Sequence, residues 1–317
     1  MPTPAIKTRT RLRAIAPISS KSAGLAMCIG ISAISAVALA LPLAMSQDYI
    51  ATLFNNSTLG QYFAGSPASA MTGPKLIYWS WQHNDDLSHL NPADAGVAIL
   101  VGRFCVNGEA FTFERNMCSV QLPAGIYREA SVRLDIQDAS ALRSPASAEV
   151  LAEKLSTKIV AISLAGSQRI AAVQIDFDAR KSERGFYTLL LRKIRAKLPD
   201  SVKLSMTALA SWCLSDNWIS PSHLPVDEVV PMLFSMGYGR DQAYQRLRQP
   251  QTLSFKSMGG RLAPGLSLQE AQAFQLLGNR LAKYQRLYLF SSSGWNAKNC
   301  QTVKLLFQKS KIASKTR

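Results

Sequence analysis

The segment AAVQIDFDA (171–179) holds the two carboxylates with the clearest potential for chemistry in this sequence. Side chains alternate along a β-strand, so Gln174, Asp176 and Asp178 share one face and the apolar residues between them share the other. Two residues along a strand separate Cα atoms by about 6.6 Å, and like charges at that distance couple, so one carboxyl holds its proton to higher pH. A protonated acid beside an ionised one is the working pair of glycoside hydrolysis.

The role of these aspartates depends on the fold around them. A carboxylate that points into the interior of a protein costs free energy unless it is paired or hydrogen-bonded. In a parallel barrel the apolar face of the strand packs on helices, the polar face points inward, and active sites lie at the carboxyl ends of the strands. Asp178, the outermost, is therefore predicted to be functional. For Asp176 a structural role, in which it bonds neighbouring strands or caps the next helix, stays open beside a functional one.

Aromatic and polar residues near the ends of other expected strands are candidates for sugar binding, because the apolar C–H faces of sugars stack on aromatic rings. The candidate substrate-binding residues are Gln174, Asp135, Trp81, His83, Trp212, Tyr238 and Trp295. Trp295 follows a Ser-rich turn and is hard to explain as core, whereas ordinary core packing explains Trp79 and Phe234 better. His83 is a possible general acid or base, but its polar neighbours are more typical of a loop hydrogen bond.

Short apolar runs alternate with helical patterns from residue 75 onward. The expected strands are 75–81, 96–104, 131–137, 171–179, 203–210, 228–236, 261–267 and 286–293. Strands followed by helices indicate a parallel sheet, and this number and size predict an α/β fold of the (β/α)8 TIM-barrel type. An open doubly wound α/β sheet is the alternative. Residues 104–130 fit the barrel poorly, because they read as a hairpin without a helix.

Capping signals and apolar spacing place the helices. Ser144 and Pro145 supply the cap and first turn of one helix, and Ser267 with Glu270 is predicted to form a capping box that opens another, through about Leu281. The apolar residues expected on buried helix faces are Leu151, Leu155, Ile159, Phe186, Leu190, Ile194, Val303, Leu306 and Phe307.

The amino terminus carries the pattern of a membrane segment. Residues 23–45 hold no charged side chain and follow a basic leader, 1–22, that has five Lys or Arg and no acid. A helix of that length spans about 34 Å, enough for a bilayer core of roughly 30 Å. The positive-inside rule then predicts a single-pass inner-membrane protein with its C-terminal domain in the periplasm. A signal peptide cleaved after the small-x-small site 38–40 is the alternative.

The composition of the rest of the chain predicts its division into segments. Residues 46–73 are polar and small and are expected to form a flexible spacer, 74–307 the barrel domain, and 308–317 a basic tail. A hydrophobic fraction of 47% with 18% charged residues excludes a disordered chain. The net charge of +16 lies largely in the two ends rather than on a folded face with aromatics, which argues against a nucleic-acid partner.

The cysteines and histidines indicate no cofactor. Five Cys are too few for a disulfide scaffold, and with three His and no Cys-x-x-Cys pair an ordinary zinc site is not expected. Cys105 and Cys118 flank the hairpin-like stretch in a compartment expected to be oxidising, so a disulfide between them is predicted. Cys213 and Cys300 form a second pair or stay as free thiols, and Cys28 lies in the membrane segment.

The run from 173 to 212, together with LIYWSWQ (76–82), resembles the bacterial family called domain of unknown function 3142. The resemblance extends over roughly 75–295. Members of that family resemble glycoside-hydrolase TIM barrels and have no assigned activity, so the resemblance implies a barrel fold and a role connected with glycans.

A more distant similarity concerns the sequence IDFD. It resembles the fourth-strand signature of chitinase-like barrels, Asp-x-x-Asp-x-Asp-x-Glu, in which Asp176 and Asp178 match the last two Asp residues. Val173 stands at the first Asp position and Arg180 at the catalytic Glu, so the proton donor and the substrate-assisted mechanism of that family are not implied. MLFSMGY (232–238) and Trp295 resemble, more weakly, the sixth strand and the last-strand tryptophan of those barrels.

Three functions are compatible with these observations. The first is an envelope glycoside hydrolase with Asp178, and Asp176 or Asp135, in the acid and base roles. The second is a non-catalytic barrel, anchored in the inner membrane, that binds a poly- or oligosaccharide. The third is a structural envelope protein without a ligand. The inward carboxylates favour the first function, and Arg180 in place of Glu favours the second.

The sequence makes one prediction about topology. Because the basic leader precedes the uncharged segment 23–45, a reporter that is active only in the cytoplasm should be silent when it is fused to the C-terminus. A periplasmic reporter fused at the same place should be active. The opposite pattern would show that the domain lies in the cytoplasm.

Overall fold

The computed structural model describes residues 73–216, 218–219, 224–249 and 261–313. These residues all belong to one compact unit that begins at Tyr62. The basic leader, the predicted membrane segment 23–45 and nearly all of the predicted spacer lie outside the described residues. Among the helices that are described, none is both long enough and apolar enough to cross a membrane.

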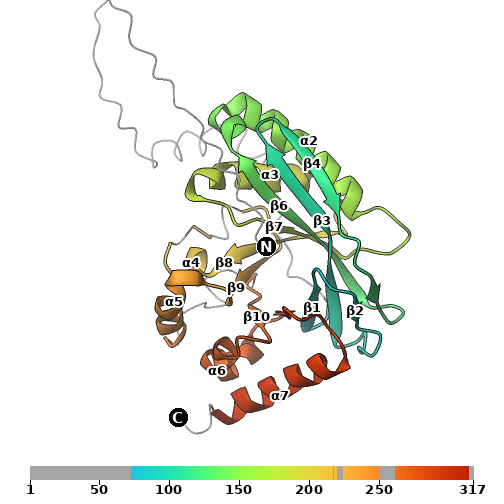
Figure 1. Cartoon of the computed structure of the whole chain (residues 1–317), viewed down its shortest axis with the longest axis vertical. Coiled ribbons are helices and arrows are strands. Elements are labelled where there is room, and N and C mark those ends of the chain that lie inside the picture. Colours follow the sequence, from blue (N-terminus) through green and yellow to red (C-terminus); the bar gives the residue numbers. More distant parts are fainter. Residues whose placement is uncertain (1–72, 217, 220–223, 250–260, 314–317) are drawn as a thin grey trace, which may run out of the picture. The chain divides into compact units, whose positions relative to one another are not determined.

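Eight parallel strands form a closed barrel (Figure 1). They are β1 (Leu76–Ser80), β3 (Ala95–Asn107), β6 (Tyr127–Asp138), β7 (Ala172–Asp176), β8 (Lys203–Leu209), β9 (Glu228–Met232), β10 (Gly265–Ser267) and β11 (Leu287–Phe290). Each strand pairs with the next in this order, and β1 pairs with both β11 and β3. The predicted barrel is therefore confirmed. The open-sheet alternative is wrong, because an open sheet leaves its two outermost strands unpaired with each other.

Helices follow most of the strands. They are α2 (Pro145–Ser163), α3 (Arg184–Lys197), α4 (Ala210–Leu214), α5 (Arg240–Leu247), α6 (Gln272–Leu277) and α7 (Ala297–Ala313), with the short helices η1 (Ser140–Arg143), η2 (Lys181–Glu183), η3 (Gly237–Gly239) and η4 (Gly278–Lys283). The predicted cap of α2 is confirmed, because Ser144 Oγ accepts a hydrogen bond from Ser147 N at 3.3 Å. α7 continues to Ala313, past the predicted end of the domain at residue 307.

The helices seal the outside of the barrel with apolar faces. α2 buries Leu151, Leu155 and Ile159, as their spacing predicts, and the matching residues of α3 are buried too. The two helices lie side by side against the β6–β7 side of the barrel (Figure 1). Val173 and Ile175 point outward into this core, which leaves the polar face of β7 to the interior, as alternation predicts.

The hairpin-like stretch is an extension of the barrel wall. β3 and β6 contain 13 and 12 residues, far more than the 5 of β7. β4 (Ala110–Arg115) pairs antiparallel with the outer part of β3, through a turn in which Gly108 adopts φ +61°. A further small ladder joins β2 (Asp85–Asp86) to β5 (Val120–Gln121). The wall formed by β3, β4 and β6 thus continues beyond the ends of the neighbouring strands.

The predicted disulfide is wrong. Cys105 and Cys118 are both free thiols. The β3–β4 ladder pairs Cys105 with Thr112 and Gly102 with Arg115, so the chain moves away from Cys105 before it reaches Cys118. From Cys105 to the end of this ladder at Gly102 and Arg115 the strands advance by three residues, or roughly 10 Å. The Cα atoms of a disulfide lie within about 7 Å of each other.

The predicted capping box of Ser267 and Glu270 is also wrong. α6 begins only at Gln272, without a side-chain cap. The carboxylate of Glu270 instead accepts a hydrogen bond from Ser235 N at 2.9 Å and lies 3.4 Å from the hydroxyl of Tyr244. The acid therefore ties the loop after β9 to α5, and this tertiary contact replaces the local one.

A buried ionic cluster closes the end of the barrel where the strands begin. Arg286 Nη1 lies 3.2 Å from Glu129 Oε1 and 3.7 Å from Glu228 Oε2. The hydroxyl of Tyr288 lies 2.8 Å from Glu129 Oε2 and 2.6 Å from Glu228 Oε2. That hydroxyl has one proton to donate, so the cluster is fully bonded only when one carboxyl is protonated. Burial accordingly raises the pKa of both glutamates, that of Glu228 to about 7.

This cluster predicts how stability depends on pH. A carboxyl whose pKa is raised in the folded state stabilises the protein fully below its unfolded value of 4.5, and this contribution is lost as pH rises through about 7. Glu228→Gln imitates the protonated form and should remove this part of the pH dependence, which is on the order of 3 kcal/mol. Urea unfolding at acid and mildly alkaline pH measures it.

The exposed Glu109 provides the matched control, because Glu109→Gln should keep the pH dependence of the wild type. Equal pH dependence in the wild type and Glu228→Gln would show that Glu228 is ionised in the folded protein throughout this range.

Candidate functional site

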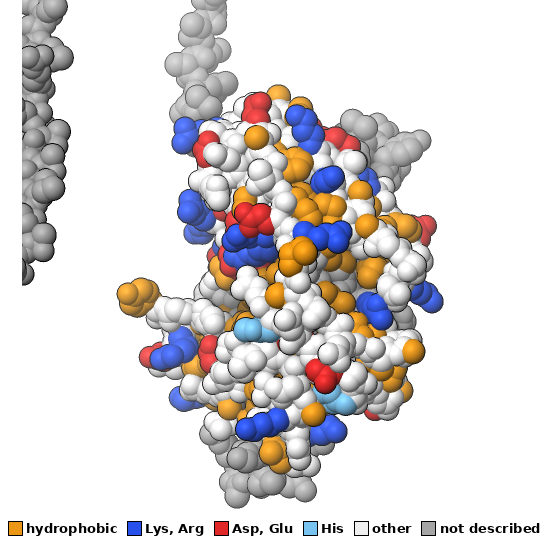
Figure 2. Space-filling model, turned by 45° about the vertical axis from the view of Figure 1, so that its right-hand side comes forward, with side chains coloured by type: hydrophobic (Ala, Val, Ile, Leu, Met, Phe, Trp, Pro, Cys, Tyr) orange, Lys and Arg blue, Asp and Glu red, His pale blue; other side chains and the backbone are white. Residues whose placement is uncertain are grey.

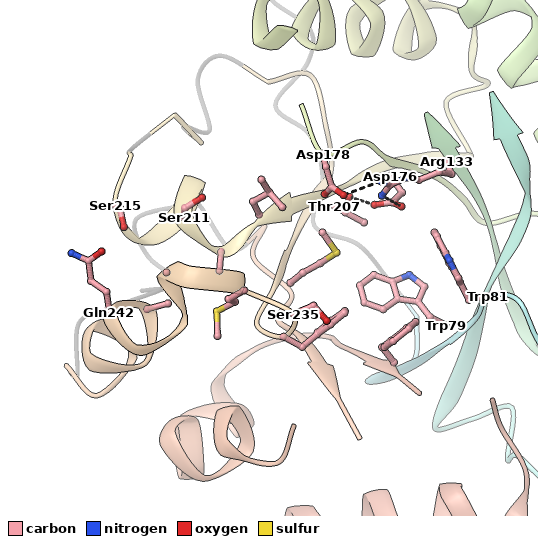
Figure 3. A pocket seen from close by; sticks show the side chains of 18 residues that line it. Trp79, Trp81, Arg133, Asp176, Asp178, Thr207, Ser211, Ser215, Ser235 and Gln242 are labelled. Atoms are coloured by element: carbon pink, nitrogen blue, oxygen red, sulfur yellow. Dashed lines mark hydrogen bonds and ion pairs between the residues drawn. The ribbon is translucent and has the colours of Figure 1, made fainter. Parts of the chain in front are cut away.

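A cavity of about 350 Å³ opens at the carboxyl ends of the strands (Figure 3). Its polar lining residues are Arg133, Asp176, Asp178, Thr207, Ser211, Ser215, Ser235 and Gln242. Its large apolar lining residues are Trp79, Trp81, Met232, Phe234, Met236 and Phe290. The two predicted aspartates are thus brought into one cavity, at the end of the barrel where the sequence predicts a site.

One guanidinium holds the carboxylates of this site in place. Arg133 of β6 donates from Nη1 to Asp176 Oδ2 at 2.7 Å and from Nη2 to Asp178 Oδ2 at 2.9 Å. Its Nε donates to Asp135 Oδ1 at 2.9 Å. The dashed lines in Figure 3 mark the contacts with Asp176 and Asp178. Arg133 therefore bridges three carboxylates and fixes the geometry of the predicted pair.

Asp176, the last residue of β7, and Asp178, two residues beyond it, lie in different surroundings. The side chain of Asp176 is 4% exposed and that of Asp178 is 39% exposed. Both oxygens of Asp176 accept hydrogen bonds, Oδ1 from Thr207 Oγ1 at 2.7 Å and Oδ2 from Arg133. Burial raises the pKa of Asp176, and the charge of Arg133 opposes this rise. The inner carboxylate is thus fully bonded, whereas the outer one faces solvent in the cavity.

Gln174 lies beneath the cavity rather than in its lining. It is buried, and its Oε1 accepts a hydrogen bond from Trp79 Nε1 at 2.6 Å and from Ser131 Oγ at 3.3 Å. Its Nε2 donates to Ser205 Oγ at 3.3 Å. Gln174 is therefore not among the residues that line the cavity, and its predicted contact with a ligand stays a prediction. Its role is to hold the indole ring of Trp79 in the floor of the cavity.

Aromatic rings form the wall opposite the aspartates (Figure 3). Trp79 packs on Phe234 and Tyr288, with ring centroids 6.2 and 5.1 Å apart. Phe234 and Phe290 stack in parallel at 5.0 Å. Trp81 lines the same cavity, and its predicted contact with a sugar stays a prediction. The assignment of Trp79 and Phe234 to ordinary core is incomplete, because both rings also line the cavity.

Two predicted tryptophans are core residues instead. Trp212 is 1% exposed and packs edge-on against Trp218 at 4.7 Å. Trp295 is 2% exposed, and its Nε1 donates to Trp79 O at 2.7 Å. Neither ring is among the residues that line the cavity. A tryptophan that follows a strand can point into the mouth or into the core, and the path of the loop turns both of these rings into the core.

The other predicted residues lie around the site or away from it. Asp135 does not line the cavity but borders its rim through Arg133. His83 Nε2 lies 3.0 Å from Ser292 O, the loop hydrogen bond that its polar neighbours indicate. Tyr238 is fully exposed on η3 and does not line the cavity.

Arg133 and Thr207 are the functional residues that sequence reasoning missed. Alternation along SVRLDIQ places Arg133 on the same strand face as the candidate Asp135, which was an available signal. The pairing of Arg133 with Asp176 in the β6–β7 register was not available. Within the parts of the chain that the structure describes, no group of three or more His, Cys, Asp or Glu side chains is placed to hold a metal ion.

Residues 128–249 match the family model described as Domain of unknown function (DUF3142). The resemblance to that family is thereby confirmed over these residues. The matched stretch includes Arg133, Asp176, Asp178 and Thr207, which are the polar residues at the centre of the cavity. No curated protein matches the chain.

Several solved structures are similar to the chain. A chitinase from Bacteroides thetaiotaomicron is 10% identical, with a TM-score of 0.45, over 78% of this chain and 99% of that one. A family GH18 chitinase from Chromobacterium violaceum is 9% identical, with a TM-score of 0.42, over 79% and 86%. The spore cortex-lytic enzyme SleL of Bacillus cereus is 13% identical, with a TM-score of 0.40, over 62% of this chain. The chain spans about half of that enzyme, 52%.

The bridging role of Arg133 predicts a large coupling energy. Arg133→Met leaves the buried carboxylate of Asp176 without its cation and should lower the free energy of unfolding by about 2–3 kcal/mol, somewhat below the loss for a fully buried pair. Adding Asp176→Asn removes the stranded charge and should restore part of the loss. Chemical denaturation of the two single variants and the double variant measures the coupling.

Arg103→Met is the matched control, because Arg103 and its partner Glu114 are about half exposed, 48% and 55%. That substitution should cost far less than Arg133→Met, because exposed ion pairs contribute little to stability. Equal losses for the two arginine variants would mean that Arg133 is no more important to the fold than a surface residue.

Proposed function

We propose that this chain is a carbohydrate-binding barrel that holds part of a poly- or oligosaccharide in the cavity at its mouth. The observation that carries the proposal is the pairing, in one cavity, of aromatic rings on one side with ion-paired carboxylates on the other. A sugar ring has apolar C–H faces that stack on aromatic rings and hydroxyl groups that bond carboxylates and guanidinium groups. The cavity volume of about 350 Å³ lies within the range of small-ligand sites, roughly 300–1,000 Å³.

The setting of the carboxylates favours binding over hydrolysis. A glycoside hydrolase needs one acid that carries a proton toward the glycosidic oxygen. Here both oxygens of Asp176 accept hydrogen bonds, and Arg133 donates to Asp176 and Asp178, so neither carboxyl is directed as a proton donor toward the cavity. Arg180, which stands where the chitinase-like signature has its Glu, is exposed and does not line the cavity. Fixed carboxylates of this kind suit hydrogen bonds with hydroxyl groups.

A glycoside hydrolase is the second candidate. It is favoured by the raised pKa of Asp176, which results from burial, next to the exposed carboxylate of Asp178. A ligand that drew Arg133 away from Asp176 would leave a buried carboxyl that takes up a proton. In that case Asp176 would be the acid and Asp178 the base or nucleophile.

We also propose that the barrel works in the periplasm, held at the inner membrane by residues 23–45. The support for this is the uncharged segment behind a basic leader in the sequence. In that location the ligand would be a polysaccharide or oligosaccharide of the cell envelope.

Substitutions in the cavity distinguish the candidates. Asp178→Asn keeps the shape of the side chain but removes its charge, and it should weaken glycan binding by a factor of about 10–100, or about 1.4–2.8 kcal/mol. Trp81→Ala removes a stacking surface and should weaken binding as well, whereas Tyr238→Ala, an exposed aromatic outside the cavity, should not. Calorimetric titration with a panel of envelope glycans measures the effects, and circular dichroism checks the fold.

The same panel is assayed for release of reducing ends. The proposal expects binding without turnover by the wild type. Turnover that disappears in Asp178→Asn would establish the hydrolase instead. If no glycan binds and Asp178→Asn changes only stability, the barrel has a structural role.

A further inference from the structure

A row of ion pairs crosses the extended wall of the barrel. Arg103 Nη2 of β3 lies 2.5 Å from Glu114 Oε2 of β4, and Arg103 Nη1 lies 3.6 Å from Asp135 Oδ2 of β6. Asp135 is 2.9 Å from Arg133, which in turn is 2.9 Å from Asp178 at the end of β7. These five residues, Arg103, Glu114, Arg133, Asp135 and Asp178, form what we call the charged face.

The strand register places this row on the open side of the wall. Arg103 pairs with Glu114 on one side and with Arg133 on the other, so their side chains share one face. Phe104 follows Arg103 on β3, and Leu134 follows Arg133 on β6. Both point to the opposite face and are fully buried in the core. The side chains of the charged face are 25–55% exposed. On the side of the molecule that Figure 2 shows, acidic and basic side chains likewise lie next to each other.

The charged face is continuous with the cavity. Arg133 and Asp178 line the cavity, and they also line a smaller hollow of about 130 Å³ at its rim, together with Asp135 and Arg180. The wall of β3, β4 and β6 therefore adjoins the opening of the cavity. Exposed ion pairs contribute little to stability, so the need for a stable fold does not explain a row of them on an open surface.

The charge of this region is opposite to that of the chain. Arg133, Asp176 and Asp178 are the charged members of the cavity lining, and the charged face adds Arg103, Asp135 and Glu114. Four carboxylates thus stand beside two guanidinium groups, and at the rim Arg180 and Glu183 balance each other. In a chain whose net charge is +16, the described residues of this site have an acidic excess that attracts cations and repels anions.

We infer that the charged face binds the units of the glycan next to the cavity, and that this glycan carries free, protonated amino groups. The inference rests on the proposed carbohydrate-binding function and adds the class of ligand. An ammonium group has three donors and no acceptor, and the carboxylates of Asp178, Asp135 and Glu114, whose side chains are 31–55% exposed, can accept such donors beside their contacts with the arginines. The two arginines hold these carboxylates in position and donate to the sugar hydroxyl groups.

Oligomers that differ only in charge test the inference. Glucosamine oligomers, N-acetylglucosamine oligomers of the same length and galacturonate oligomers are titrated into the protein at a pH below the pKa of the amines. The glucosamine oligomers should bind about tenfold more tightly than the acetylated ones at about 0.01 M salt. This advantage should shrink at about 0.15 M salt, where the Debye length falls from about 30 to about 8 Å. Galacturonate oligomers should bind most weakly.

Variants of the charged face locate the effect. Glu114→Gln and Asp135→Asn should each reduce the preference for glucosamine oligomers about threefold to tenfold. Glu114→Gln should leave unchanged the binding of an acetylated disaccharide that fills the cavity alone, because Glu114 contacts no residue of the cavity lining in the described structure. Glu149→Gln is the matched control, because Glu149 is an exposed acid of α2 with a side-chain exposure of 51%, outside the charged face.

The possible outcomes separate this inference from the proposed function. If acetylated and free-amine oligomers bind equally, or Glu114→Gln and Asp135→Asn have no effect, the inference fails, while loss of binding in Asp178→Asn would still support the carbohydrate-binding barrel. Tighter binding of galacturonate oligomers would overturn the charge argument. If no glycan of any charge binds, both the inference and the proposed function are wrong.

Discussion

The contact between Arg133 and the buried carboxylate of Asp176 is the interaction on which the site depends. A carboxylate that is 4% exposed loses most of its hydration, and a protein tolerates that loss only when charges and donors replace the water. Arg133 supplies the charge at 2.7 Å, and Thr207 supplies a second donor at 2.7 Å. The same guanidinium also donates to Asp178 and Asp135. The arginine that compensates the buried charge of Asp176 therefore also fixes the positions of the other two carboxylates at the mouth of the barrel.

Layers of side chains below this contact fill the end of the barrel where the strands begin and leave the other end open. Glu129, Glu228, Arg286 and Tyr288 fill the end where the strands begin, and Gln174 with Trp79 forms the layer above them. Hydrogen bonds across the barrel join each layer, from β11 to β6 and β9 in the lower layer and from β1 to β7 in the upper one, so its polar atoms are compensated without water. The remaining space lies at the carboxyl ends, where Trp79 becomes the floor of the cavity. The cavity is therefore the top of a filled barrel.

Local patterns in the sequence predicted the fold and half of the site, and long-range geometry decided the rest. Alternation in VQIDFD placed Asp176 and Asp178 correctly, because the period of a strand is a property of the chain itself. The bond between Arg133 and Asp176 depends on the register of two strands whose paired residues are 43 positions apart. The same is true of Glu270, which bonds Ser235 rather than its own helix, and of Trp212 and Trp295, whose loops turn the rings into the core.

The central claim is that the mouth of the barrel binds a glycan intact, with Arg133 holding the two aspartates in fixed positions. A crystal structure with a soaked glucosamine oligosaccharide tests it most directly. The account predicts an uncleaved chain with one ring against Trp79 and Trp81, hydroxyl groups bonded to Asp178, and the Arg133–Asp176 contact unchanged. A cleaved sugar, an Arg133 displaced from Asp176, or an empty cavity with the oligosaccharide bound elsewhere would contradict it.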